Sequence, residues 1–171
     1  MIYKFNGIEP KIGENNFIAE NSSVIGSVIT GSNVSIWFST VLRADCSYIE
    51  VGNNSNIQDN CTVHGDINTP VIIGENVTIG HNCVIHGCKI GNNVVIGMGS
   101  ILLNGSIVPD NCIIGAGSVV SKKLIIEKED LVIGNPPKIV RKLSEANVEY
   151  IKYAANLYIK EIELYKKLVK I

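Results

Sequence analysis

Aliphatic residues recur every six positions along most of the chain, and each is followed by a short polar stretch that often begins with glycine. A period of six is neither the 3.6-residue period of an amphipathic helix nor the alternation of a long strand. It predicts one short strand and one turn per repeat, with three repeats closing one triangular coil. The aliphatic positions are Ile12, Ile18, Val24, Ile36, Leu42, Val51, Ile57, Val63, Ile73, Ile79, Ile85, Ile90, Ile96, Leu102, Val108, Ile114 and Val120.

Stacking of these coils would create the hydrophobic core. One coil cannot bury its own aliphatic side chains, but stacked coils gather them into a continuous column. With Thr30 as an imperfect member, the eighteen repeats give six coils, which at the usual strand spacing form a prism about 29 Å tall. Glycines and the asparagines suit corners that need positive φ; these asparagines are Asn33, Asn53, Asn76 and Asn93. The pattern predicts an all-β fold, a parallel β-helix.

The period slips at three places. Three extra residues fall within residues 42–51, four fall within residues 63–73, and one residue is missing from residues 85–90. The second slip predicts a small external loop over residues 65–70. Irregularities in a strict array often mark a functional site, although neutral insertions would leave the same pattern.

The repeat is lost after Val120, and a helix is predicted near the C-terminus. Residues 134–137 (Gly-Asn-Pro-Pro) form a turn signal, and Ser144 is a suitable N-cap. The helix has an apolar seam of Val148, Ile151, Ala155, Tyr158, Ile162, Tyr165 and Val169. We expect this seam to cover the prism of its own or of a neighbouring subunit. Residues 1–171 therefore form a single domain, with the β-helix over about 10–126 and the helix over about 144–170.

Composition narrows the functional class. The net charge is −1 and the pI is about 6.3, so no basic field favours nucleic acid. The N-terminus does not resemble a signal peptide, and no apolar run approaches the roughly 18 residues needed to cross a membrane. We expect a cytoplasmic protein that binds no membrane and no nucleic acid.

The five cysteines are expected to be reduced, because none forms a CxxC motif. Cys61, Cys83 and Cys112 occupy a small inward slot of the repeat, which indicates core thiols. Cys46 and Cys88 border slips, and either is expected to be more exposed.

The three histidines lie close together in the repeat. His64 and His86 each directly follow an aliphatic residue of the same face in successive coils, so they should stack one strand spacing apart. Arg43 occupies the same slot one coil below. His81 lies on another face, with Asp59 in its slot one coil below.

Two stacked imidazoles suit one metal ion, but His81 cannot join them within one subunit because it lies around a corner. A cyclic trimer would place the His64/His86 face of one subunit against the His81 face of the next. The same docking would pair Arg43 with Asp59. Three histidines with an open fourth position are typical of catalytic zinc. Unrelated surface histidines and a structural metal that only joins the subunits are the alternatives.

Several motifs of this region occur together in a known family. They are Leu42-Arg43-Ala44-Asp45, Asn56-Ile57-Gln58-Asp59-Asn60, Val63-His64-Gly65, Gly80-His81-Asn82-Cys83-Val84-Ile85-His86-Gly87 and Gly97-Met98-Gly99-Ser100. With the C-terminal helix they resemble the gamma-class carbonic anhydrases over essentially the whole chain. The hexapeptide repeat alone is weakly specific, because many acyltransferases share it, whereas the histidine set with its Arg and Asp partners is strongly specific.

The resemblance implies a left-handed β-helix and a homotrimer with Zn2+ (or Fe2+ or Co2+) at each subunit interface. His64 and His86 would come from one subunit and His81 from its neighbour, and Arg43 and Asp59 would pair between subunits. Asp45 would support the interface and Gln58 would hydrogen-bond the metal-bound water. Tyr158 resembles a tyrosine that some relatives place near the site, although its position is equally explained by helix packing.

The activity implied is reversible hydration of CO2 to bicarbonate by metal-bound hydroxide. The sequence departs from the family pattern in two places. Cys46 stands where the pattern has Glu, and the loop at residues 65–70 has Asp66 as its sole carboxylate. The proton route is therefore poor and activity is expected to be weak. The alternatives are an acyltransferase that uses CoA thioesters, with one histidine as general base, and a non-catalytic trimer held together by metal.

Overall fold

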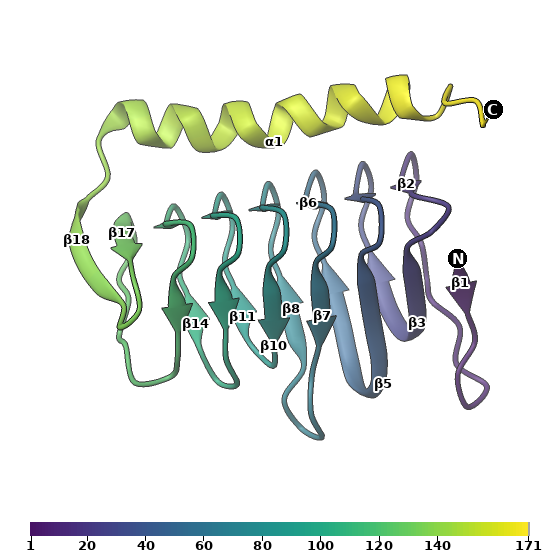
Figure 1. The fold of residues 1–171 in the computed structure, drawn as a ribbon, viewed down its shortest axis with the longest axis horizontal. Coiled ribbons are helices and arrows are strands. Elements are labelled where there is room, and N and C mark those ends of the chain that lie inside the picture. The colour runs from purple at the N-terminus through teal and green to yellow at the C-terminus, as the bar shows by residue number, and fades with distance from the viewer. Residues whose placement is uncertain (171) are drawn as a thin grey trace.

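The computed structural model describes residues 1–170 as a three-sided prism of stacked coils with one long helix beside it (Figure 1). The left-handed parallel β-helix predicted from the sequence is confirmed. The first face carries eight strands. The first seven in chain order are parallel, and the last is antiparallel to its neighbour. These strands are β2 (Phe17–Ile18), β4 (Ser35–Ile36), β6 (Asn56–Ile57), β9 (Thr78–Ile79), β12 (Val95–Ile96), β15 (Ile113–Ile114), β17 (Asp130–Ile133) and β18 (Lys138–Lys142).

The other two faces are joined by two long strands, β3 (Ser23–Thr30) and β5 (Val41–Val51), which continue from the second face onto the third. The second face continues with β7 (Thr62–His64), β10 (Val84–His86), β13 (Ile101–Leu102) and β16 (Val119–Val120). The third face continues with β8 (Val71–Ile73), β11 (Lys89–Ile90) and β14 (Ile107–Val108), and β1 (Ile2–Tyr3) pairs with β3.

The core is the predicted aliphatic column. On the first face Ile36, Ile57, Ile79, Ile96, Ile114 and Val132 stack in register, and all are completely buried. Each fully buried aliphatic side chain stabilises the fold by about 1.5–3 kcal/mol through burial of apolar surface. A strand of two residues suffices in the inner coils because each of them is paired on both sides.

The prism extends further than the sequence pattern indicated. Ile126 and Val132 continue the spacing of six after Val120, and β17 pairs with β15. The repeat is hidden because Asp130 occupies the inward slot that Cys112 fills one coil earlier. Its carboxylate is 2 % exposed, and it accepts hydrogen bonds from Glu127 N–H at 2.8 Å and pairs with Lys142 Nζ at 3.0 Å. The stack therefore has about seven turns instead of six.

One of the asparagines predicted to have positive φ at the corners does not have it. Asn33, Asn76 and Asn93 have positive φ as expected, but Asn54 (φ 62°) takes this role in place of Asn53. The left-handed residue is the third after the aliphatic position, whereas Asn53 is the second and uses its side-chain oxygen to accept Ser32 N–H at 2.8 Å. The glycines after the aliphatic positions serve close approach instead of positive φ: a Cβ at Gly74 would lie 2.6 Å from the carbonyl oxygen of Gly91.

The cysteines carry free thiols. Cys61, Cys83 and Cys112 are buried as predicted, and Cys46 is exposed. The expectation that Cys88 is more exposed is wrong, because this side chain is buried at the shortened turn of the third slip. Burial raises the pKa of the Cys88 thiol to about 12, so it stays protonated at neutral pH.

The helix α1 (Glu145–Tyr165) runs back along the prism toward the first coils (Figure 1). Ser144 is its N-cap, and Asn147 Oδ1 accepts the Ser144 backbone N–H at 3.1 Å. The predicted seam packs through Ile151, Ala155 and Ile162, whereas Val169 lies beyond the end of the helix and is exposed. Within residues 1–170 no helix is both long and apolar enough to span a bilayer.

Candidate metal centre

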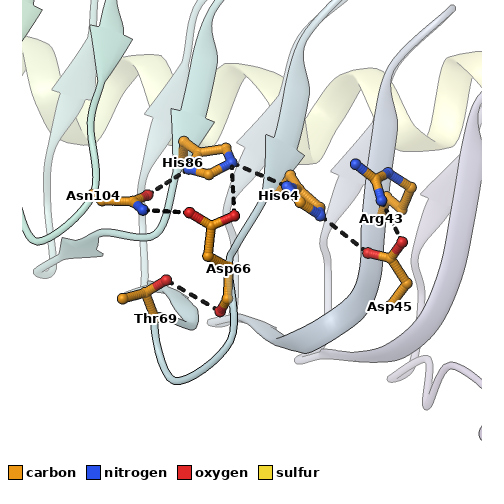
Figure 2. Close-up of polar contacts among 7 residues, drawn as sticks. All are labelled: Arg43, Asp45, His64, Asp66, Thr69, His86 and Asn104. Carbon is orange, nitrogen blue, oxygen red and sulfur yellow. Dashed lines mark hydrogen bonds and ion pairs between the residues drawn. The ribbon is translucent and has the colours of Figure 1, made fainter.

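His64 and His86 form the centre of a polar cluster on the second face (Figure 2). They end β7 and β10, which pair in register with His86 opposite His64, so the predicted stacking is confirmed. His64 Nδ1 lies 3.0 Å from His86 Nε2. Both rings are mostly shielded by neighbouring coils, with 12 % and 29 % of their side-chain surfaces exposed.

Asp45 fixes the proton of His64. Its Oδ1 lies 3.0 Å from His64 Nε2, and its Oδ2 pairs with Arg43. Partial burial raises the pKa of Asp45, but hydrogen bonds from Arg43 and His64 outweigh it and the pKa is lowered overall. An ionised carboxylate only accepts hydrogen bonds, so His64 carries its proton on Nε2 and presents the Nδ1 lone pair to His86.

Asn104 fixes the proton of His86 in the same way. Asn104 Nδ2 donates to Asp66 Oδ2 at 2.6 Å, so the amide oxygen must face the other way, where it meets His86 Nδ1. His86 then carries its proton on Nδ1 and presents the Nε2 lone pair. Two lone pairs that face each other share no proton, which suits a cation that both can coordinate.

The donor set fits a metal such as zinc. Two nitrogen ligands of a tetrahedral zinc are about 3.4 Å apart, close to the 3.0 Å found here. Asp66 Oδ1 lies 4.0 Å from His86 Nε2, and the ligating atoms of His64, Asp66 and His86 all lie within 4.8 Å of one another. Within residues 1–170 the cluster holds two of the three predicted histidine ligands.

The third predicted ligand, His81, follows β9 on the first face. Its Nδ1 pairs with Asp59 Oδ2 at 2.8 Å, and Asp59 Oδ1 accepts Phe38 N–H at 3.1 Å. Neither group of ligating atoms around His64 includes His81. The predicted pair between Arg43 and Asp59 does not form within one chain, because Arg43 pairs with Asp45 and Asp59 pairs with His81.

Tyr158 lies with His81 and Asp59 in a cleft of about 290 Å³ between α1 and the first face. Its ring packs edge-on against Trp37 with centroids 5.3 Å apart. Burial, helped by the negative charge of Asp59, raises the pKa of Tyr158 to about 12. The hydroxyl is therefore a hydrogen-bond donor at neutral pH.

Gln58 is buried beside Asp59, with its side-chain Nε2 3.2 Å from Asn56 Oδ1. The Gln58 amide therefore donates a hydrogen bond to Asn56 within the same chain.

The sequence did not indicate Asn104. It follows Leu102 by two positions, whereas the histidines follow their aliphatic residues by one, so a search of the histidine slot finds Leu103. The turn after β13 brings Asn104 beside His86 nevertheless. Cys46 also lies near the cluster, within 4.8 Å of the ligating atoms of Asp45 and His64.

Comparison with known proteins identifies the family. Residues 70–104 and 105–122 match the hexapeptide repeat of succinyl-transferase. The chain is 38% identical to a carbonic anhydrase of Geobacillus kaustophilus over 98% of this chain and 92% of that protein. It is 39% identical to the mitochondrial gamma carbonic anhydrase 2 of Arabidopsis thaliana over 88% of this chain and 56% of that protein.

A solved structure shares the complete fold. A hexapeptide transferase family protein from Anaplasma phagocytophilum superposes with a TM-score of 0.92 at 38% identity, over 96% of this chain and 97% of that one. Sequence identity at this level over nearly full length shows common descent, and it agrees with the resemblance drawn from the histidine motifs. The chain belongs to the gamma-class carbonic anhydrase family of hexapeptide-repeat proteins.

Proposed function

We propose that the protein is a zinc-dependent carbonic anhydrase that hydrates CO2 reversibly to bicarbonate, as a homotrimer with its metal centres between subunits. The observation that supports this proposal is that His64 Nδ1 and His86 Nε2 direct their lone pairs toward each other. An oxygen partner on the other nitrogen of each ring holds it in this form. His81 of a second copy would complete the ligand set, since Asp59 holds its Nδ1–H and leaves Nε2 free. Fe2+ or Co2+ would suit the same donors.

A zinc ion held by three histidines would lower the pKa of water to roughly 7 and so supply hydroxide at neutral pH. The residues of the chain position the reactants. The Tyr158 hydroxyl can donate a hydrogen bond to an oxygen of CO2 or bicarbonate in the cleft beside His81. The Gln58 amide is proposed to orient the reacting water, and Arg43 and Asp59 to pair across the interface.

Proton release limits the proposed activity. The cluster offers one carboxylate on the loop after β7, Asp66, and Cys46 stands where the family pattern has Glu. External buffer can replace a missing proton acceptor, so we expect imidazole buffer to raise the rate of CO2 hydration. The free thiols, including the exposed Cys46, favour a reducing compartment and therefore the cytoplasm.

Metal analysis of the purified protein tests the proposal most directly. We expect about one metal ion per chain and hydration of CO2 that is lost on chelation and regained with zinc. A trimer without metal after growth in zinc-containing medium would refute the metal centre. Metal without hydration at any imidazole concentration would favour a non-catalytic trimer. Saturable acetyl-CoA binding without metal would favour the acyltransferase activity suggested by the names of the hexapeptide transferase relatives.

A further inference from the structure

One amide joins the loop after β7 to the histidine pair. Asn104 touches His86 through its oxygen and Asp66 through its nitrogen (Figure 2). The two contacts depend on each other, because the carboxylate can accept only the NH2 end of the amide. Asp66 therefore sets the orientation of Asn104, and Asn104 sets the proton position of His86.

The surrounding backbone is shaped around this contact. A Cβ at Gly87, where φ is +51°, would lie 2.4 Å from Asn104 Oδ1. A Cβ at Gly65 would lie 2.3 Å from the Thr69 carbonyl oxygen. Thr69 closes the loop, since its backbone N–H and its hydroxyl both donate to the carbonyl oxygen of Asp66, at 3.0 and 3.1 Å. The loop is thus fixed at the residue that orients the amide.

We propose that Asn104 is a positioning residue of the metal centre, which holds His86 in the Nδ1–H form and so keeps Nε2 ready to bind metal. The inference rests on the proposed function only in that a metal binds at His64 and His86. An imidazole without this partner distributes its proton between both nitrogens, and its ring is free to turn. Partners of this kind typically change metal affinity 10- to 100-fold.

Four variants separate the contacts of Asn104. Asn104→Ala removes both, and we expect the dissociation constant for zinc, measured by competition with a chromogenic chelator, to rise about 10- to 100-fold. Asn104→Asp keeps an acceptor for His86 but places a carboxylate against Asp66. Combining it with Asp66→Asn gives the introduced carboxylate a donor again, so the double variant should bind zinc within a few-fold of Asp66→Asn alone.

Asn92→Ala is the matched control. Asn92 also follows a buried aliphatic residue by two positions, and its side-chain oxygen accepts Glu75 N–H at 2.8 Å, at a corner that does not touch the histidines. We expect it to change thermal stability but leave zinc affinity unchanged. Equal loss of affinity in Asn92→Ala and Asn104→Ala would show a general effect on the fold and overturn the proposal.

The proton position can also be read without metal. In the apoprotein, 15N chemical shifts of His86 should show the Nδ1–H form in the natural sequence and a mixture of the two forms in Asn104→Ala. An unchanged His86 signal together with unchanged zinc affinity would overturn the inference while leaving the metal centre intact. Failure of the natural protein to bind zinc would instead refute the proposed function.

Discussion

Complementation between two defective variants tests whether the metal centre is shared between subunits. His64 and His86 lie on the second face, whereas His81 lies on the first face beside Asp59 and outside the group of converging ligand atoms. His81→Ala and His86→Ala should each lose bound zinc, because each removes a ligand from every centre. Mixed trimers of the two variants should nevertheless recover part of the bound zinc.

The recovered fraction follows from the cyclic arrangement. Each centre would take His64 and His86 from one subunit and His81 from its neighbour. With equal amounts of the variants and random assembly, one subunit in two offers an intact pair, and one neighbour in two offers an intact His81. Over all trimers, about one quarter of the centres would then be complete; because trimers of a single variant have none, trimers that contain both variants would have about one complete centre in three. If all three histidines came from one chain, no centre would be complete.

The measurement is zinc per chain in trimers that contain both variants, prepared by joint unfolding and reassembly. Each variant carries a different affinity tag, and the natural protein treated in the same way provides the reference of one zinc per chain. Every trimer that contains both variants would have one complete centre among its three, so a content of about one third of the reference would support the shared centre. Mixed trimers of normal size that contain no zinc would refute it.

Three further predictions concern single residues. Gly74→Ala should destabilise the fold by about 3 kcal/mol, because the added Cβ would meet the backbone of the next coil. Gly99→Ala has open space around the added Cβ, so it should destabilise the fold by only about 1 kcal/mol, through the positive φ of +69°. Urea unfolding of both variants tests this, and equal losses of stability would contradict the coil spacing. The pKa of Asp110 is lowered from 3.8 by the Asn92 backbone N–H and then by Lys128, so Asp110→Asn should cost about 1 kcal/mol at pH 7. This difference should shrink as the pH falls below 3.8 and vanish below the lowered pKa, and a difference that persists in acid would exclude the carboxylate as its source. Tyr158→Phe keeps the packing on Trp37, so melting should be unchanged while CO2 hydration falls about tenfold through the lost hydroxyl.

The fold could be predicted largely because stacking imposes one rule on every coil. A residue such as Ile79 must be aliphatic since it packs between Ile57 below and Ile96 above, so the spacing of six records the architecture directly. The rule fails where a polar residue occupies an inward position of the repeat and its polar atoms find partners there. Asp130 occupies a core position through Lys142 and the Glu127 N–H, and its charge hides the last coil from a pattern of hydrophobic residues.

The candidate site was predictable only in part. Register places His64 over Arg43 and under His86, and this follows from counting. The path of a turn does not follow from counting, so the contact of Asn104 with His86 could not be predicted. Nor can one chain test the pairing of Arg43 with Asp59, because that contact depends on how subunits dock.

The three slips of the repeat acquire a common meaning in the structure. Regular stacking gives His64 and His86 neighbours only above and below, whereas their oxygen partners must approach from the side. The first slip bulges β5 between Ala44 and Ile49 and presents Asp45, and the second forms the loop that carries Asp66. The third places Gly87 where a side chain would displace Asn104. Neutral insertions would have no reason to act on the same two rings, so the slips favour a functional centre over chance.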